Sequence, residues 1–216
     1  LKEGISYIYT LDLVRWVMGI FGIVFLLTVA PSNLAPLMIA RNFGTEVWKL
    51  TVFEVSFSIG MALGGALVAI FAKKFSRISM IIGTSIFFGF TAVSLGFTTN
   101  LILFYILFFI IGIAVPSFFT SAMTLLQETV EPERQGRVFG FVGIVISLAM
   151  PIGMSVLGPL ADVFPVENLM IATGTAMAVV ATAAVLLPAG RRAIAAAHAS
   201  TGKSDSISDT VSEAKE

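Results

Sequence analysis

Residues 127–141, QETVEPERQGRVFGF, place five charged side chains between two long apolar segments, residues 101–126 and 138–160. Pro132 predicts a helix break here, and Gly136 predicts a hinge. On both sides the chain is far more apolar than a soluble domain. Its 216 residues are 57% hydrophobic and 12% charged, with a mean hydropathy of +0.97, whereas soluble domains contain about 25% charged residues. The sequence therefore predicts an all-α integral membrane protein.

The composition also excludes several classes of function. Lys+Arg and Asp+Glu both number 13, and a nucleic-acid-binding protein would need a basic excess. The chain has no Cys and one His, His198, so disulfides, thiolate metal sites and His-based catalysis are excluded. The apolar segments contain no paired carboxylates and no nucleophile next to a base. We therefore expect neither an enzyme nor a cofactor.

Six segments are long enough, at about 1.5 Å per residue, to cross a hydrocarbon layer of about 30 Å. We expect spans near residues 17–40, 50–71, 78–97, 101–126, 138–160 and 169–187. The predicted domains are an interfacial amphipathic helix or linker at 1–13, a six-helix bundle at 14–192 and a disordered tail at 193–216.

Basic residues lie mainly on one side of these spans. Of the 13 Lys and Arg residues, only Arg41 and Lys49 fall on the side opposite the termini. Because basic residues concentrate in cytoplasmic segments, both termini and residues 127–141 are predicted to be cytoplasmic.

The second and fifth spans resemble each other. Residues 59–71, IGMALGGALVAIF, align without gaps on residues 152–164, IGMSVLGPLADVF, with six identities in thirteen positions. The two spans run in opposite directions, so the match predicts two inverted three-helix repeats, which are typical of transporters. A chance match between Gly-rich apolar helices is the alternative. Small residues at such helix contacts allow close approach, and the candidates are Gly60, Gly64, Gly65, Gly153, Gly158 and Pro159.

Glu54 is an ionisable residue within the second span. Inserting it costs on the order of 3 kcal/mol, so such a residue normally faces the bundle interior or a wet cavity. It is our candidate site for a proton or a cationic substrate. The alternative is a carboxylate near the outer interface, paired with Lys49 or Arg41. Glu54 shares a polar stripe, separate from the glycines, with Thr51, Ser58 and Met61.

Two other spans contain polar candidates. After Pro116, a second stripe at helical spacing contains Ser117, Ser121, Thr124 and Glu128. It could line a cavity, or its hydroxyls could bond to their own helix. Asn33 lies between Pro31 and Pro36 and could expose its amide to the same cavity, although helix distortion alone would explain the prolines. The candidates for proton or substrate binding are therefore Glu54, Asn33, Ser58, Met61, Ser117, Ser121 and Thr124.

Two motifs resemble the major facilitator superfamily of transporters. Residues 130–140, VEPERQGRVFG, resemble the cytoplasmic loop between the tenth and eleventh helices of that family, and residues 158–162, GPLAD, resemble the end of the eleventh. The similarity covers residues 1 to about 192 and is closest to bacterial multidrug and macrolide exporters. It implies the C-terminal half of a twelve-helix fold in a bacterial cytoplasmic membrane. The implied partners are an N-terminal six-helix half, a small-molecule substrate and the bilayer, and a proton gradient is the implied energy source.

The resemblance is incomplete at two motifs. Residues 64–77 lie where the family repeats a loop motif of Gly, Asp, Arg and Gly, but the Asp and the second Gly are missing. Gly158 and Pro159 resemble an antiporter motif that belongs to the fifth helix, which this chain does not contain. Antiport is therefore suggested rather than shown.

The family resemblance implies that two six-helix bundles rock about a central cavity and that charged cytoplasmic loops latch the inward gate. The gate candidates are Lys73, Lys74, Arg77, Glu128, Glu131, Arg134 and Arg137. Their charges could instead reflect only membrane topology and solvation. The expected function is proton-coupled efflux of drugs or other small amphipathic compounds. The alternative is a non-transporting six-helix subunit or scaffold that acts through self-association.

Overall fold

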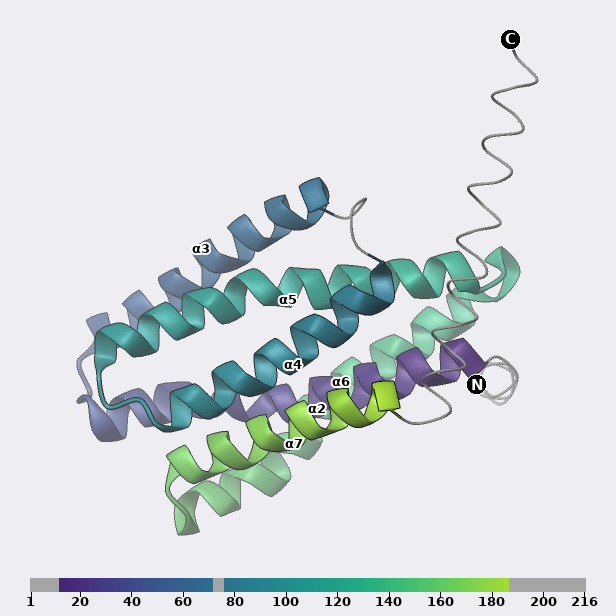
Figure 1. Ribbon diagram of the computed structural model, residues 1–216. Coiled ribbons are helices and arrows are strands. Elements are labelled where there is room, and N and C mark those ends of the chain that lie inside the picture. Colours follow the sequence, from purple (N-terminus) through teal and green to yellow (C-terminus); the bar gives the residue numbers. More distant parts are fainter. Residues whose placement is uncertain (1–11, 72–75, 187–216) are drawn as a thin grey trace.

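The computed structural model describes residues 12–71 and 76–186. Apart from residues 12 and 13, the expected interfacial helix at 1–13 lies outside this part, and so does the tail at 193–216. The described part is a bundle of long helices (Figure 1), which are α2 (Asp12–Asn42), α3 (Val47–Phe71), α4 (Arg77–Gly96), α5 (Leu101–Thr129), α6 (Pro132–Val163) and α7 (Val166–Leu186).

These six helices are long and apolar enough to cross a membrane, so the predicted class of fold is confirmed. We call the end of the bundle that contains Asp12 and Leu186 the terminal face, and the other end the opposite face. The helices extend beyond the predicted spans, because hydropathy marks only the apolar part of each helix. For example, α2 begins at Asp12 rather than at residue 17.

The charged stretch at 127–141 is mostly helical rather than a loop. Only Val130 and Glu131 separate α5 from α6, and Pro132 occupies the start of α6, where its missing N–H costs no hydrogen bond. The Gln135 side chain donates to the carbonyl oxygens of Gln127 (3.0 Å) and Val130 (3.1 Å). This side chain therefore satisfies carbonyls that the end of α5 leaves without helical partners.

The helices pair between two units, α2–α4 and α5–α7, rather than within them. α3 packs on α5 and α6 packs on α2, while α4 packs on both α5 and α7, and α2 also packs on α7. Exchanging α2 with α5, α3 with α6 and α4 with α7 maps this set of contacts onto itself. The equivalent helices α3 and α6 also run in opposite directions across the bundle. The fold is therefore a pair of inverted three-helix repeats, as the sequence predicts.

Glycines mark equivalent contacts in the two units. A Cβ built on Gly60 of α3 would overlap the carbonyl oxygen of Phe109 and lie 3.1 Å from the Cα of Gly112, both in α5. Gly153 of α6 aligns with Gly60, and a Cβ there would lie 2.7 Å from the side chain of Val29 in α2. Residues that match in the repeat alignment thus contact helices that are themselves equivalent.

One close contact between α4 and α7 is reciprocal. A Cβ on Gly89 would lie 2.8 Å from both the Gly174 oxygen and the Ala178 nitrogen. A Cβ on Gly174 would lie 2.8 Å from both the Gly89 oxygen and the Val93 nitrogen. The pseudo-twofold axis that relates the two units therefore passes between these two glycines.

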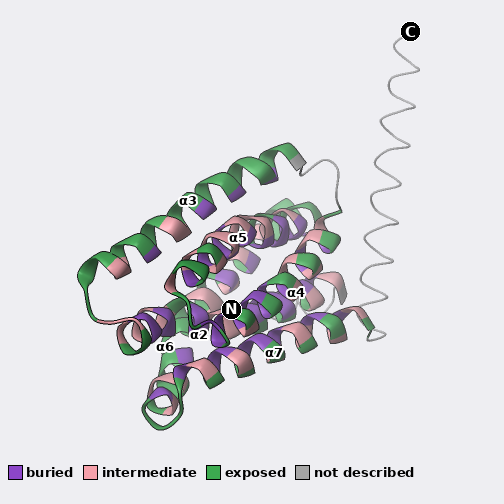
Figure 2. Cartoon of the chain, turned by 60° about the vertical axis from the view of Figure 1, so that its left-hand side comes forward, coloured by how far each residue is buried: buried purple, intermediate pink, exposed green. Residues whose placement is uncertain are grey.

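α3 and α6 are the helices that the rest of the bundle covers least. In Figure 2 most of α3 is exposed. Its apolar side chains outside the contact with α5 remain uncovered, among them Val55, Ile59, Leu63, Leu67 and Ile70.

Candidate functional site

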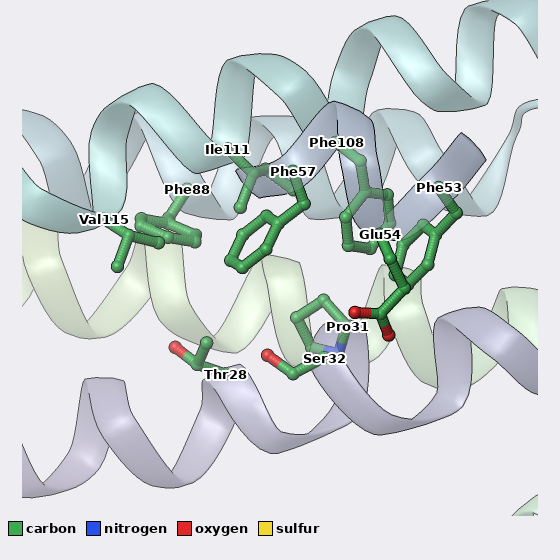
Figure 3. Close-up of a pocket in the computed structure, with 10 residues that line it drawn as sticks. All are labelled: Thr28, Pro31, Ser32, Phe53, Glu54, Phe57, Phe88, Phe108, Ile111 and Val115. Carbon is green, nitrogen blue, oxygen red and sulfur yellow. The ribbon is translucent and has the colours of Figure 1, made fainter. Parts of the chain in front are cut away.

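A cavity of about 140 Å³ lies between α2 on one side and α3 and α5 on the other (Figure 3). It lies in the half of the bundle nearer the opposite face, because Glu54 comes about two turns after α3 begins there at Val47. The cavity is partly open. Its walls are mainly apolar, and the residues that line it are Thr28, Pro31, Ser32, Phe53, Glu54, Phe57, Phe88, Phe108, Ile111 and Val115.

Aromatic packing builds the wall formed by α3 and α5. The Phe53 and Phe108 rings meet edge to face with centroids 4.5 Å apart, and Phe57 meets Phe108 edge to face at 6.3 Å. Phe108 is in turn stacked on Phe104 at 5.1 Å. Edge-to-face and offset-stacked pairs stabilise each other beyond simple burial, so this wall is rigid.

α2 forms the opposite wall and makes few contacts with α3. Pro31 lies inside α2, where it lacks an N–H and removes one bond of the helical ladder. One turn earlier, the Thr28 hydroxyl donates to the Val24 carbonyl oxygen at 2.7 Å. Ser32 is exposed, and its side chain points into the cavity beside Pro31.

Glu54 is the charged residue among those that line the cavity. Its carboxylate points across the gap toward Pro31 and Ser32 (Figure 3). The predicted alternative partners are engaged elsewhere. Lys49 bonds to the Glu46 carboxylate at 2.6 Å and to the Phe43 carbonyl oxygen, whereas Arg41 donates to the Ala161 carbonyl oxygen at 2.8 Å. Within residues 12–71 and 76–186, therefore, neither cation pairs with Glu54.

The other predicted binding residues lie outside this cavity. Ser58 and Met61 are exposed on α3, and the Asn33 amide donates to the Val29 carbonyl oxygen of its own helix at 3.1 Å. On α5, Ser117 and Thr124 are half-buried, while the buried Ser121 hydroxyl lies 3.6 Å from the Met80 sulfur. The structure thus brings Glu54 to the cavity and leaves these six residues elsewhere.

Sequence reasoning missed the hydroxyl and aromatic residues of the cavity. Phe53 and Phe57 are four residues apart on α3, and Thr28 and Ser32 are four apart on α2. Side chains with this spacing share one helix face. Phe53 and Phe57 lie one residue before and three residues after Glu54. This spacing was the signal that could have identified the two phenylalanines.

The predicted packing residues fall into two groups. Gly60, Gly64 and Gly153 lie at contacts between helices, where a side chain would not fit. A Cβ on Gly65 or Gly158 would meet nothing within 4 Å, and Pro159 is exposed on α6.

Several of the predicted gate residues form ion pairs at the terminal face. Arg77, at the start of α4, lies 3.5 Å from the Glu128 carboxylate at the end of α5. Arg134, in the first turn of α6, lies 3.2 Å from Glu131, which lies in the break between α5 and α6. Arg137 is exposed near the start of α6, and Lys73 and Lys74 lie outside the described residues.

The opposite face has an equivalent polar contact that the sequence did not predict. At the end of α2, Arg41 donates to the Ala161 carbonyl oxygen and lies 3.9 Å from the Asp162 carboxylate, both in α6. The adjacent Asn42 donates to the Glu167 carboxylate at the start of α7. Under the exchange of units, α2 and α7 correspond to α5 and α4, so the contact between Asn42 and Glu167 is the counterpart of the pair between Arg77 and Glu128.

Comparison with known proteins agrees with this architecture. The model of the Major Facilitator Superfamily matches residues 16–212. Macrolide efflux protein A of Streptococcus pyogenes is 31% identical over 157 residues, which is 71% of this chain and 39% of that protein. The protein of the same name from Enterococcus faecalis is 32% identical over 136 residues, 62% of this chain and 42% of that protein.

A third relative is Multidrug efflux pump Tap of Mycolicibacterium fortuitum, which is 29% identical over 149 residues, or 68% of this chain and 36% of that protein. In these three alignments the chain covers 36% to 42% of the length of the relatives. The family match extends over nearly all of the bundle, and the inverted repeats agree with it. The chain therefore belongs to the Major Facilitator Superfamily.

Proposed function

We propose that this chain is the C-terminal half of a proton-coupled exporter of small amphipathic compounds, which works by alternating access. The observation that carries the proposal is a carboxylate, Glu54, in an aromatic cavity within the bundle. A carboxylate within a membrane span can bind either a proton or a cation, and such residues mark ion and substrate pathways. The names of the relatives agree with efflux.

The exposed surfaces of the bundle support a partner half. α3 and α6 are equivalent in the repeat, and the bundle covers both only slightly. A second six-helix unit that covers them would also close the open side of the cavity. Rocking of that unit against this one would then expose Glu54 to the two sides of the membrane in turn. In this proposal both termini lie in the cytoplasm of a bacterial cell, and the basic terminal face lies on the same side.

The test is transport by the full reading frame in inverted membrane vesicles energised by a proton gradient. Uptake of erythromycin is measured with and without an uncoupler. We expect the uncoupler to abolish uptake. We expect Glu54→Gln to reduce uptake at least tenfold, because a side-chain amide, unlike a carboxylate, does not take up and release a proton near neutral pH. Thr51→Val is the matched control. Thr51 lies on the same helix outside the cavity, and its hydroxyl donates a hydrogen bond to the Val47 carbonyl oxygen of its own helix. Undiminished proton-driven uptake by Glu54→Gln would refute the assignment.

The alternative is a six-helix subunit that acts by self-association without transport. The exposed apolar faces of α3 and α6 are the observation that favours it. Expression of residues 1–216 alone separates the two functions. A half-transporter should show no uptake, because its cavity is open on one side. Uptake by the isolated chain would contradict the proposal of a missing half.

A further inference from the structure

The cavity at Glu54 is too small for a whole amphipathic drug. Its volume is about 140 Å³, close to the roughly 150 Å³ of an engineered apolar cavity that binds one benzene molecule. Drug-sized ligands occupy pockets of about 300–1,000 Å³. The cavity can therefore enclose a single compact group, and the rest of any ligand must extend through its open side.

The lining specifies the chemistry of that group. Four phenylalanines face the cavity together with one carboxylate, Glu54. Aromatic faces attract cations. Thr28 already donates its hydroxyl proton to Val24, so the polar lining offers one anion and one further hydroxyl, Ser32. A compact cation with an apolar exterior satisfies this combination, whereas a strongly hydrated or polyhydroxylated group does not.

The equivalent helix of the other repeat does not share this lining. When the repeat alignment is extended toward the start of each span, Glu54, Phe53 and Phe57 of α3 correspond to Ser147, Ile146 and Met150 of α6. The equivalent helix thus has the same packing glycine, Gly153, without the acid or the aromatic residues. The repeat does not dictate these three side chains, so the acid and its two aromatic neighbours distinguish α3 from its equivalent helix.

We infer that the cavity is a head-group site for a monovalent ammonium with methyl-sized substituents, such as a dimethylamino or trimethylammonium group. The inference rests on the proposed function in that the bound molecule is the exporter's substrate. Glu54 neutralises the head group, the aromatic wall limits its size, and the apolar body of the molecule lies outside this half. Selection therefore depends on the charge and width of the head group and tolerates many different bodies.

Equilibrium binding to the full-length protein in lipid nanodiscs tests the inference. Four probes share one fluorescent tail and end in trimethylammonium, triethylammonium, tripropylammonium or the uncharged tert-butyl isostere of trimethylammonium. We expect the trimethylammonium probe to bind at least tenfold more tightly than the tripropylammonium and tert-butyl probes. The tripropylammonium head has more heavy atoms than benzene and exceeds the cavity, and the tert-butyl head lacks the charge.

Two variants separate size from charge. Phe57→Ala removes one wall, so the tripropylammonium probe should gain affinity at least tenfold relative to trimethylammonium. Glu54→Gln should reduce the preference for trimethylammonium over tert-butyl at least tenfold while keeping the order of head sizes. Phe90→Ala is the matched control, because Phe90 is 66% exposed on α4 and does not line the cavity. It should change neither preference.

The outcomes distinguish this inference from the proposed function. Binding that is indifferent to head-group width, or equal for the charged and uncharged probes, overturns the inference even if vesicle transport is intact. If the probes bind in the expected order but the vesicles show no proton-driven transport, the head-group site is supported and the exporter function is refuted. The wild-type probe series decides the question by itself, so a variant that fails to fold leaves the test intact.

Discussion

At the scale of single residues, Gly44 fixes the connection between α2 and α3. Its φ of +109° is a backbone conformation that residues with a Cβ rarely adopt. A Cβ there would also lie 2.6 Å from the Glu46 carboxylate, which is part of the pair with Lys49. The turn therefore depends on a residue without a side chain.

We expect Gly44→Ala to destabilise the protein by about 1–3 kcal/mol, the usual cost of a strained backbone conformation. The measurement is thermal unfolding of the detergent-solubilised full-length protein. Gly83→Ala in α4 is the control, because a Cβ there meets nothing within 4 Å. Alanine in a helix is favoured by up to about 1 kcal/mol, so the control should be neutral or slightly stabilising. Equal melting temperatures for the two variants would contradict the role of the turn.

Glu46, at the same turn, gives a prediction for pH. The hydrogen bond from Lys49 is the main cause that lowers the pKa of the Glu46 carboxyl below its usual 4.5. A lowered pKa means that the pair stabilises the turn above the ordinary pKa and that this contribution is lost as the pH falls below it. We expect the carboxyl carbon signal of Glu46 in NMR to titrate below pH 4.5 and to move upward in Lys49→Gln. An unchanged midpoint in that variant would show that Lys49 is not the cause.

At the scale of helices, the contact between α3 and α5 depends on backbone approach. Gly60 and Gly112 face each other, and a Cβ on either would overlap a carbonyl oxygen of the other helix. Membrane helices gain little from apolar burial against each other, so close packing of small residues replaces it. Gly65, five positions after Gly60 on the same helix, has open space around it.

We expect Gly60→Ala and Gly65→Ala to have opposite effects. The first forces α3 away from α5 and should cost about 1–3 kcal/mol, as overpacking does. The second fills open space and should be neutral or stabilising by up to about 1 kcal/mol. Thermal unfolding of the two single variants measures the difference. A stable Gly60→Ala protein would mean that the contact is looser than the structure shows.

The number of helices and their repeat could be predicted because each span is a long apolar run and because Gly60 and Gly153 lie in matching motifs. The ends of the helices could not be predicted from hydropathy, because polar residues such as Asp12 and Gln127 lie within helices. Glu54 was recognisable because a charge is rare in an apolar span. Phe108 was not recognisable, because 19 phenylalanines occur in the chain and composition does not say which of them face a cavity.

At the scale of the whole molecule, polar contacts join the two repeats at both faces. Arg41 at the opposite face donates to a backbone carbonyl and also lies near a carboxylate. Arg77 at the terminal face makes a partly exposed ion pair with Glu128. Both arginines are partly exposed, Arg41 at 43% and Arg77 at 30% of the side chain, so solvent weakens both ion pairs. The hydrogen bond from Arg41 to a backbone carbonyl oxygen, at 2.8 Å, is shorter than the 3.5 Å contact of Arg77, and hydrogen bonds from charged groups contribute about 1.5–3 kcal/mol. The contact at the opposite face should therefore be the stronger one.

Hydrogen–deuterium exchange of the full-length protein tests this difference. We expect Arg41→Gln to accelerate amide exchange about tenfold or more near residues 160–168, because the end of α6 loses its tie to α2. Arg77→Gln should accelerate exchange near residues 126–130 by a smaller factor and leave 160–168 unchanged. Comparable effects at both faces, or a larger effect of Arg77→Gln, would contradict the ranking.

The pairing of helices between the two repeats has a consequence for biosynthesis. The ribosome releases α2, α3 and α4 before α5 has been made, yet these three helices make few contacts with one another. They must therefore reside in the bilayer without their main partners in this bundle until α5, α6 and α7 arrive. Insertion and assembly are thus distinct steps in time. A nascent chain that stops at Asn100 would contain α2, α3 and α4 before any of their main partners in this bundle had been made.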